Sequence, residues 1–230
     1  MYALLLLAAA VLGCGGCSDD GGRSDDAPNA DAGGQDAGFS DAAASAPLSV
    51  RWTSSPMPTA AIDPATTTVS SVMLHIDQLQ VIGDAGEPDA TTAMGLALSW
   101  SQNFGPADTQ FSAAPPALYS KVKIIIGQAG QSAPAIDIMG TIDLGGATPE
   151  LFRVKTNADT SLQVSGYTAQ LQPSGTANLE VVFDLSEALR TVDIASLPHA
   201  NGIYTLDDSQ GAAMNAFLGN LDAAFQRPGL

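Results

Sequence analysis

The residue types that most often carry enzyme chemistry are scarce in this 230-residue chain. Its two histidines, His75 and His199, lie far apart, and its two cysteines, Cys14 and Cys17, both lie near the N-terminus. A zinc site needs three or four histidine, cysteine or carboxylate ligands at suitable spacing, and the sequence has no phosphate-binding loop or serine-nucleophile motif. We therefore expect no metal, no cofactor and no catalytic residue. His75 is expected to be an ordinary surface or hydrogen-bonded side chain.

Carboxylates are the abundant ionisable group, with 24 acidic residues against eight Lys and Arg and a net charge of -16. Two carboxylates brought together by the fold would allow acid-base cleavage of a glycosidic bond, and the sequence leaves this alternative open. The negative charge repels polyanions, so nucleic acid is not an expected partner.

Two sets of charged residues each allow a functional and a structural interpretation. The turn that contains Asp84, Glu87 and Asp89 offers oxygen ligands for Ca²⁺, but a solvated hairpin turn is the favoured interpretation. Half of the basic residues alternate along two predicted strands, where they form either a cationic stripe or, as we favour, a solvated face with cross-strand pairs. These four residues are Lys121, Lys123, Arg153 and Lys155.

The N-terminus contains an apolar run, Tyr2 to Leu12, followed by Gly13 and Cys14. The run is shorter than the roughly 20 residues that cross a bilayer and suits the apolar region of a signal peptide. The segment Val11-Leu12-Gly13-Cys14 resembles the lipobox of bacterial lipoproteins. The resemblance implies cleavage after residue 13 and fatty acylation, including palmitate, at Cys14, with Cys17 as the alternative acceptor. Residues 1–13 depart from the pattern because no Lys or Arg precedes the apolar run, and the competing interpretation is a buried element of a cytoplasmic protein.

Residues 14–47 are expected to be a lipidated N-terminus followed by a disordered acidic linker. From Ser18 to Pro47 the chain has no Leu, Ile, Val or Met, so it offers little apolar surface to offset the entropy of ordering. Several acyl chains would anchor the protein stably to a membrane. We expect residues 48–230 to form an extracytoplasmic domain in the cell envelope, preferably at the outer membrane.

After Pro47 the sequence has short apolar runs bounded by Gly, Pro, Asn and Asp, which is typical of an all-β domain. The spacing predicts an antiparallel two-layer β-sandwich with one short helix and a C-terminal amphipathic helix. The expected strands are Leu48 to Thr53, Thr67 to Ile82, Met94 to Trp100, Leu118 to Gly127, Ile136 to Leu144, Leu151 to Thr156, Leu162 to Leu171 and Ala177 to Leu185.

Alternation within these runs predicts which side chains face the core. In the second strand the apolar parity changes between Ile76 and Leu79, which predicts a bulge near Asp77-Gln78. In the fourth strand, Leu118 is expected on the same face as Val122, and Tyr119 on the opposite face.

Two helices are predicted near the C-terminus. The Asp184-x-x-Glu187 spacing predicts a capping box that opens a short helix ending at Arg190. The last helix, Ser209 to Phe225, is expected to be capped by Asp208 or Ser209 and to dock on the sandwich with an apolar stripe. That stripe consists of Met214, Phe217, Leu218, Leu221 and Phe225.

Two short motifs, Pro115-Pro116-Ala117-Leu118-Tyr119-Ser120-Lys121-Val122 and Leu179-Glu180-Val181-Val182-Phe183-Asp184, follow Phe111. Over Val69 to Leu189 the chain resembles uncharacterised β-sandwich lipoprotein domains of bacterial envelopes, although the glycine usual before the tyrosine is replaced here. The resemblance implies a prealbumin-like or immunoglobulin-like sandwich without an assigned activity. Tyr119 is expected to bond its hydroxyl to nearby backbone.

These observations favour a non-catalytic binding or interaction module anchored to a membrane, with a surface glycan or another envelope protein as its partner. The alternatives are a hydrolase of an envelope polymer that uses a carboxylate pair, and a structural component of a surface assembly joined through the terminal helix.

Overall fold

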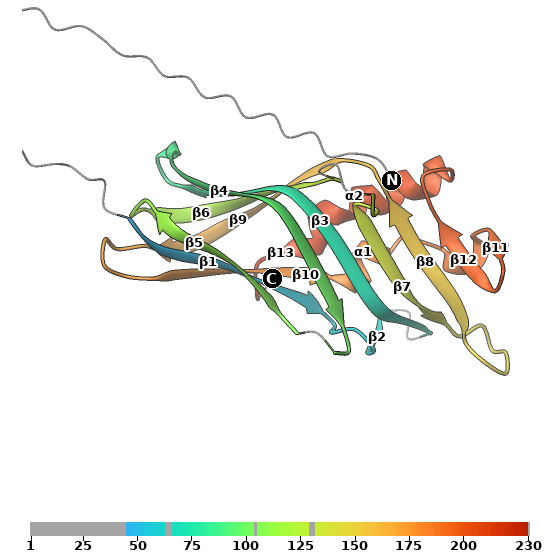
Figure 1. Cartoon of the computed structure of the whole chain (residues 1–230). Helices are drawn as coiled ribbons and strands as arrows, with labels where there is room; N and C mark the ends of the chain where they lie inside the picture. The colour runs from blue at the N-terminus through green and yellow to red at the C-terminus, as the bar shows by residue number, and fades with distance from the viewer. Residues whose placement is uncertain (1–44, 63–65, 104, 129–131, 230) are drawn as a thin grey trace, which may run out of the picture. The chain divides into compact units, whose positions relative to one another are not determined.

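A computed structural model describes residues 45–62, 66–103, 105–128 and 132–229 (Figure 1). The expected signal peptide, Cys14, Cys17 and the linker up to residue 44 lie outside the described residues. The side chains of residues 87–89 are also not described. No helix in the described residues has the length and apolar character needed to span a bilayer.

The described chain forms two sheets that do not close into a barrel, which confirms the predicted two-layer sandwich (Figure 1). The small sheet has the order β13 (Phe225–Gln226), β10 (Ala177–Asp184), β1 (Ala46–Ser55) and β5 (Ala107–Ala114). The large sheet has the order β11 (His199–Ala200), β12 (Ile203–Leu206), β8 (Glu150–Thr156), β7 (Ile136–Ile142), β3 (Thr67–Gly83), β6 (Leu118–Ile126) and β9 (Thr160–Gln170), and β2 (Ala61–Ile62) and β4 (Gly86–Ser101) also pair with β3.

Most neighbouring strands are antiparallel, as expected, but β1 pairs with β10 and β12 pairs with β8 in parallel. All eight predicted strands are present within one or a few residues, except that β4 begins at Gly86 instead of Met94. The sequence reading missed β5 and the short strands β2, β11, β12 and β13. In β5, Phe111 is the one large apolar residue, and the other four strands are two to four residues long, which is too short to show alternation.

The parity change predicted in β3 is confirmed. Its pairing with β6 shifts between Ile76 and Gln78, so that Ile76 and Leu79 both face the core. The neighbouring strand β4 keeps its register with β3 through this point, and there Gly95 has a φ of 64°. A positive φ suits glycine, and it lets β4 bend together with β3. A second shift, between Val69 and Ser71, was not predicted.

The predicted orientation of Tyr119 is wrong. Its side chain is fully buried together with Val122, whereas Leu118 is only half-buried. The register between β6 and β9 shifts between Tyr119 and Lys121, which turns the start of β6 over by one residue. The expected backbone bond is confirmed, because the Tyr119 hydroxyl donates to the Pro115 carbonyl oxygen at 2.8 Å.

Helix α1 (Leu185–Leu189) confirms the predicted start at Asp184, whose carboxylate accepts a hydrogen bond from the Glu187 amide at 3.0 Å. The predicted cap of helix α2 (Gly211–Ala224) is wrong, because Gln210 occupies the N-cap position without a side-chain capping bond. Asp208 does not cap α2 because its carboxylate bonds to Thr156 and to the Asn157 amide. A short 3₁₀ helix, η1 (Ile194–Ser196), follows α1.

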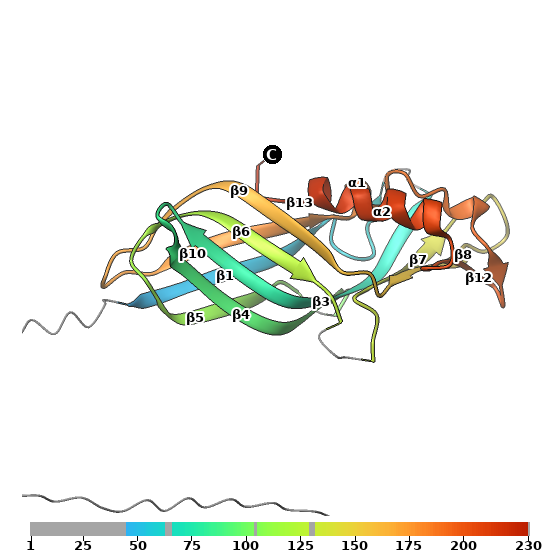
Figure 2. The ribbon, with the colours of Figure 1, turned by 90° about the horizontal axis from the view of Figure 1, so that it is seen from above.

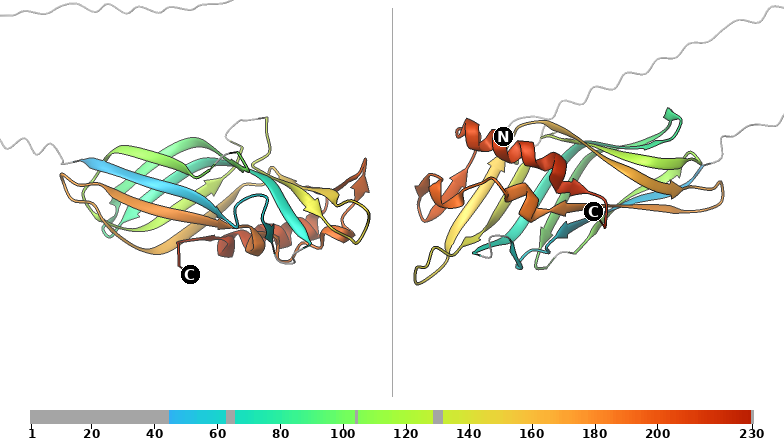
Figure 3. Two further views of the ribbon diagram at one scale, coloured as in Figure 1. Left: turned by 90° about the horizontal axis from the view of Figure 1, so that it is seen from below. Right: turned by 180° about the vertical axis from the view of Figure 1, so that it is seen from behind.

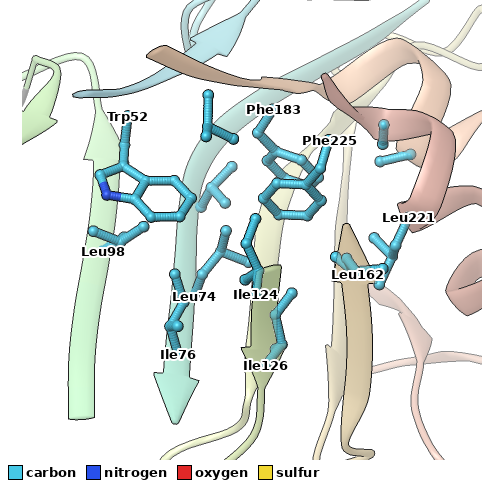
Figure 4. Packing of buried hydrophobic residues seen from close by; sticks show 14 of the residues in the cluster. Trp52, Leu74, Ile76, Leu98, Ile124, Ile126, Leu162, Phe183, Leu221 and Phe225 are labelled. Carbon is cyan, nitrogen blue, oxygen red and sulfur yellow. The ribbon is translucent and has the colours of Figure 1, made fainter. Parts of the chain in front are cut away.

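The core lies between the large sheet and a mixed second layer. That layer is the small sheet at one end of the domain and the helices at the other (Figures 2 and 3). In Figure 4, Trp52 and Phe183 of the small sheet face Leu74 and Ile124 of the large sheet. The predicted apolar stripe of α2 is used inside the domain, since Met214, Phe217, Leu221 and Phe225 are buried and Leu218 is half-buried.

Candidate functional site

The large sheet forks at His75. Along one edge of β3, β7 pairs with Thr67–Leu74 and β6 pairs with Ile76–Gly83. The His75 amide donates to the Ala135 carbonyl at 2.8 Å, and the Gly127 amide donates to the His75 carbonyl at 3.1 Å. His75 of β3 therefore bonds both to the residue that follows β6 and to the residue that precedes β7. The loops after β6, β8 and β12 gather on this side of the fork.

Side chains tie these three loops together. Asp208, in the loop after β12, accepts hydrogen bonds from the Thr156 hydroxyl at 2.5 Å and from the Asn157 amide at 3.1 Å. Gln128, in the loop after β6, donates to the Asn157 side-chain oxygen at 2.8 Å and to the Ala133 carbonyl at 3.0 Å. The loop positions are thus set by side-chain bonds as well as by the strands.

Between these loops is a hollow of about 280 Å³, which we call the loop pocket. A second hollow of about 400 Å³ lies next to it, and Asn157 and Asp208 line both. The second hollow is more apolar, with Met214 and Leu218 of α2 in its wall. The loop pocket is lined by Ser132, Pro134, Lys155, Thr156, Asn157, Asp207, Asp208 and Ser209.

The electrostatics of the loop pocket centre on Asp207 and Lys155. The Ser209 hydroxyl and amide donate to Asp207 Oδ1 at 2.6 and 3.0 Å. These bonds, together with the charge of Lys155, hold the pKa of Asp207 below its usual range, although slight burial opposes them. Asp207 therefore stays ionised at neutral pH. The pocket presents carboxylate, ammonium, hydroxyl and amide groups to a ligand, and none of its described lining residues is histidine or cysteine.

The fork also brings together two carboxylates. Asp77 Oδ2 and Asp159 Oδ1 both lie within 3 Å of the position that a Cβ atom on Gly127 would occupy. Asp77 Oδ1 is buried and has no hydrogen-bond partner in the described part of the chain. The sequence indicated only a bulge at Asp77, and nothing in it linked that residue to Asp159.

Comparisons with known proteins add no assignment. No family model, no curated protein and no solved structure matches the chain.

The acidic turn predicted at Asp84 is a β-hairpin turn. Asp84 and Ala85 connect β3 to β4, and Gly86 has a φ of 79°. The side chains of Glu87 and Asp89 are not described. Within the described residues no group of three or more His, Cys, Asp or Glu side chains is placed to hold a metal ion.

The two histidines lie apart, and each has a local partner. His75 Nδ1 lies 2.6 Å from the Pro134 carbonyl oxygen, which confirms the hydrogen-bonded role expected for it. His199 Nε2 lies 3.6 Å from Glu150 Oε2, and its ring stacks on Tyr204.

The four cations of the predicted stripe do not form a continuous stripe. Lys121 and Lys123 lie on β6, whereas Arg153 and Lys155 lie on β8, and β3 and β7 separate these strands in the sheet order. Arg153 makes a bidentate pair with Asp137 at 2.8 and 2.6 Å. The cross-strand pairing that we favoured is thus present on β7 and β8, and Lys155 contributes to the loop pocket.

The sequence reading missed most of the loop pocket. Four of its eight lining residues, Asn157, Asp207, Asp208 and Ser209, lie in short polar runs that directly follow strands β8 and β12. Such runs are typical of turns and do not by themselves indicate a binding site. Only the parallel pairing of β12 with β8 places them side by side.

Proposed function

We propose that this chain is a lipid-anchored protein of the cell envelope whose β-sandwich is a non-catalytic binding or interaction module. Its partner would be an envelope glycan or another envelope protein. The Leu12-Gly13-Cys14 motif supports the anchor. The loop pocket carries the binding role, because three loops held on a rigid sheet converge on a polar hollow, and binding residues concentrate on such loops.

The chemistry of the loop pocket favours a polar partner with hydroxyl and amine groups. Both carboxylate oxygens of Asp208 are used within the protein. Asp207 and Lys155 supply the remaining charges, one of each sign. A ligand with hydroxyl groups can bond to both, whereas a large polyanion would meet the overall negative charge of the chain.

The anchor is tested by metabolic labelling of the full chain with palmitate in a bacterial host. We expect Cys14→Ala to abolish labelling and to release the protein from the membrane fraction, and Cys17→Ala to leave both unchanged. Labelling that persists in Cys14→Ala but disappears in Cys17→Ala would assign the acyl chains to Cys17. An unlabelled wild-type protein that keeps residues 1–13 would contradict the anchor altogether.

The binding role is tested with the full chain in detergent on an array of bacterial envelope glycans. We expect Lys155→Gln to weaken a positive signal about tenfold, because a charge-assisted hydrogen bond is worth about 1.5 kcal/mol or more. Lys123→Gln, on β6, is the matched control and should bind as the wild type does. Equal weakening by both variants would show a non-specific charge effect and would contradict a role for the loop pocket.

The carboxylates at the fork favour a second candidate, the hydrolase of an envelope polymer. Asp77 and Asp159 meet the basic requirement of two acids close together. Release of reducing ends from isolated envelope polysaccharide, lost in both Asp77→Asn and Asp159→Asn but kept in Asp143→Asn, would establish the hydrolase. A binding module releases no reducing ends in any of the four proteins.

A further inference from the structure

The two sheets leave a groove on the side where β9 faces β10. Strand β10 pairs with β1 along its whole length, but on its other edge β13 pairs only with Val182 and Phe183. Pro228 follows shortly after β13 and cannot donate a backbone hydrogen bond. In the described chain the edge of β10 from Ala177 to Val181 therefore has no strand partner. Figures 1 and 3 show β9, β10 and the C-terminal segment side by side here.

Two side chains bridge this groove. The Tyr167 hydroxyl, on β9, donates to the Glu180 carbonyl oxygen of β10 at 2.8 Å. Arg227 Nη1 donates to the Gly166 carbonyl oxygen at 3.0 Å. Burial raises the pKa of Tyr167, so its hydroxyl stays protonated as a donor at neutral pH. The first bond joins β9 to β10, and the second joins the C-terminal segment to β9.

The hollow between these edges has a volume of about 310 Å³. Its wall contains one cation, Arg227, and one carboxylate, Glu180, so it is nearly neutral. The Tyr167 ring adds a flat apolar surface. The remaining lining residues are Gly166, Thr168, Ala169, Asn178, Leu179 and Pro228.

Several polar groups in the wall keep unused hydrogen-bonding capacity. Glu180 Oε1 accepts from the Thr53 hydroxyl at 3.1 Å, which leaves Oε2 as an acceptor. Asn178 Oδ1 accepts from Ser49, which orients the amide and leaves its two Nδ2 hydrogens as donors. Arg227 forms no ion pair with a carboxylate among the described residues, so its guanidinium keeps further donors.

We propose that the groove between β9 and β10 is a binding site for a neutral saccharide. Asn178, Glu180 and Arg227 offer donors and an acceptor for adjacent hydroxyl groups, and the Tyr167 ring offers an apolar surface for the C–H face of a sugar ring. The volume lies at the lower end of the range for small-molecule sites. This site is separate from the loop pocket, and the inference uses the proposed function only for the binding role.

The test is a titration of the ¹⁵N-labelled full chain in detergent with maltose, cellobiose and N,N′-diacetylchitobiose, followed by NMR. We expect at least one disaccharide to shift the amide signals of residues 166–169 and 178–180. Arg227→Gln and Glu180→Gln should each weaken that binding about tenfold, because each removes a charge-assisted hydrogen bond. Arg190→Gln, on the far end of α1, is the matched control and should bind as the wild type does.

Three results would overturn the proposal. The first is that none of the disaccharides shifts these signals. The second is that shifts appear only around Lys155, Asn157 and Asp207, which would leave the binding module intact but place its ligand in the loop pocket. The third is that sodium sulfate shifts the Arg227 region while the sugars do not, which would make the groove an anion site. Unchanged amide spectra of the variants without ligand ensure that weakened binding is not a folding defect.

Discussion

Trp52 and Trp100 are both fully buried, and their indole N–H groups differ in their hydrogen bonding among the described residues. Trp52 Nε1 donates to the Thr109 hydroxyl at 3.0 Å. Trp100 Nε1 is buried without a partner in the described part of the chain. A buried donor without a partner costs about 1–3 kcal/mol.

We therefore predict that Trp52→Phe destabilises the domain more than Trp100→Phe does, by about 1–2 kcal/mol. Trp52→Phe removes the hydrogen bond to the Thr109 hydroxyl, whereas Trp100→Phe removes a donor that has no partner among the described residues. Both changes lose similar ring area, so each is the control for the other. Urea unfolding followed by the fluorescence of the remaining tryptophan measures the difference. Equal losses of unfolding free energy would contradict the assignment of the unpaired donor.

Gly140 on β7 is required because there is no space for a side chain. A Cβ atom there would lie closer than 3 Å to the Thr68 carbonyl oxygen and to the Phe152 ring. We expect Gly140→Ala to cost about 3 kcal/mol, at the upper end for overpacking, because one of the obstructing atoms belongs to the backbone. Gly146→Ala is the control, since its nearest contact would be 3.7 Å away, and its cost should be below about 1 kcal/mol. Similar midpoints for the two variants in urea would contradict this prediction.

At the scale of elements, Asp184 connects β10, α1 and β13. Its Oδ1 accepts from the Glu187 amide, and its Oδ2 accepts from Gln226 Nε2 at 3.2 Å. Of the predicted capping box only the Asp half is seen in the described bonds, because the Glu187 side chain pairs with Arg190 at 3.3 Å.

The loss of this cap should be measurable. We expect Asp184→Ala to lower the free energy of unfolding by about 1–2 kcal/mol, because it removes the N-cap bond and the bond to Gln226. Glu187→Gln should cost less than about 0.5 kcal/mol, because it affects only one ion pair at 3.3 Å, whose Arg190 partner is exposed. The reverse order of the two variants in denaturant titrations would show that the Glu half of the box is the important one.

The turn before α2 is expected to loosen at acid pH. The pKa of Asp207 is lowered in the fold by the Ser209 bonds, so its ionised form contributes stability above the usual aspartate pKa. That contribution is lost as the pH falls through the lowered folded-state pKa. The Ser209 amide signal in NMR should titrate with Asp207, below the usual aspartate range. A midpoint at or above the usual range would contradict the bonding described here.

At the scale of the whole domain, the C-terminal segment joins the helical layer to the small sheet. Phe225 follows α2 directly and stacks on Phe183 of β10, with ring centroids 4.6 Å apart. Asn220 of α2 donates to the Ala188 carbonyl at 3.2 Å and to the Thr191 hydroxyl at 2.9 Å. The C-terminal helix is therefore part of the core and not an appendage.

We expect Phe225→Ala to cost about 3–5 kcal/mol, because it leaves a cavity between the two layers. Leu218→Ala, on the half-buried side of α2, is the matched control and should cost less than half as much. Thermal unfolding followed by circular dichroism compares the two. If Phe225→Ala unfolds at the wild-type temperature, the C-terminal segment does not contribute to the core.

Alternation of apolar residues predicted most strands of the large sheet and the bend at Asp77-Gln78, and the Asp184-x-x-Glu187 spacing predicted the start of α1. These features depend on side-chain periodicity or on bonds between residues a few positions apart, which the order of residues specifies directly. The acyl acceptor Cys14 also comes from a local motif, and it stays a prediction because it lies outside the described residues.

Only the tertiary structure decided which residues meet across long separations. In the folded domain the Tyr119 side chain lies in the core, and the Asp208 carboxylate bonds to Thr156 instead of capping α2. The fold also places Asp77 near Asp159. It also formed the loop pocket and the groove between β9 and β10 from segments that look like ordinary turns and strand edges. These outcomes depend on strand pairing and on one-residue register shifts, and a shift of one residue moves a side chain to the opposite face of the sheet.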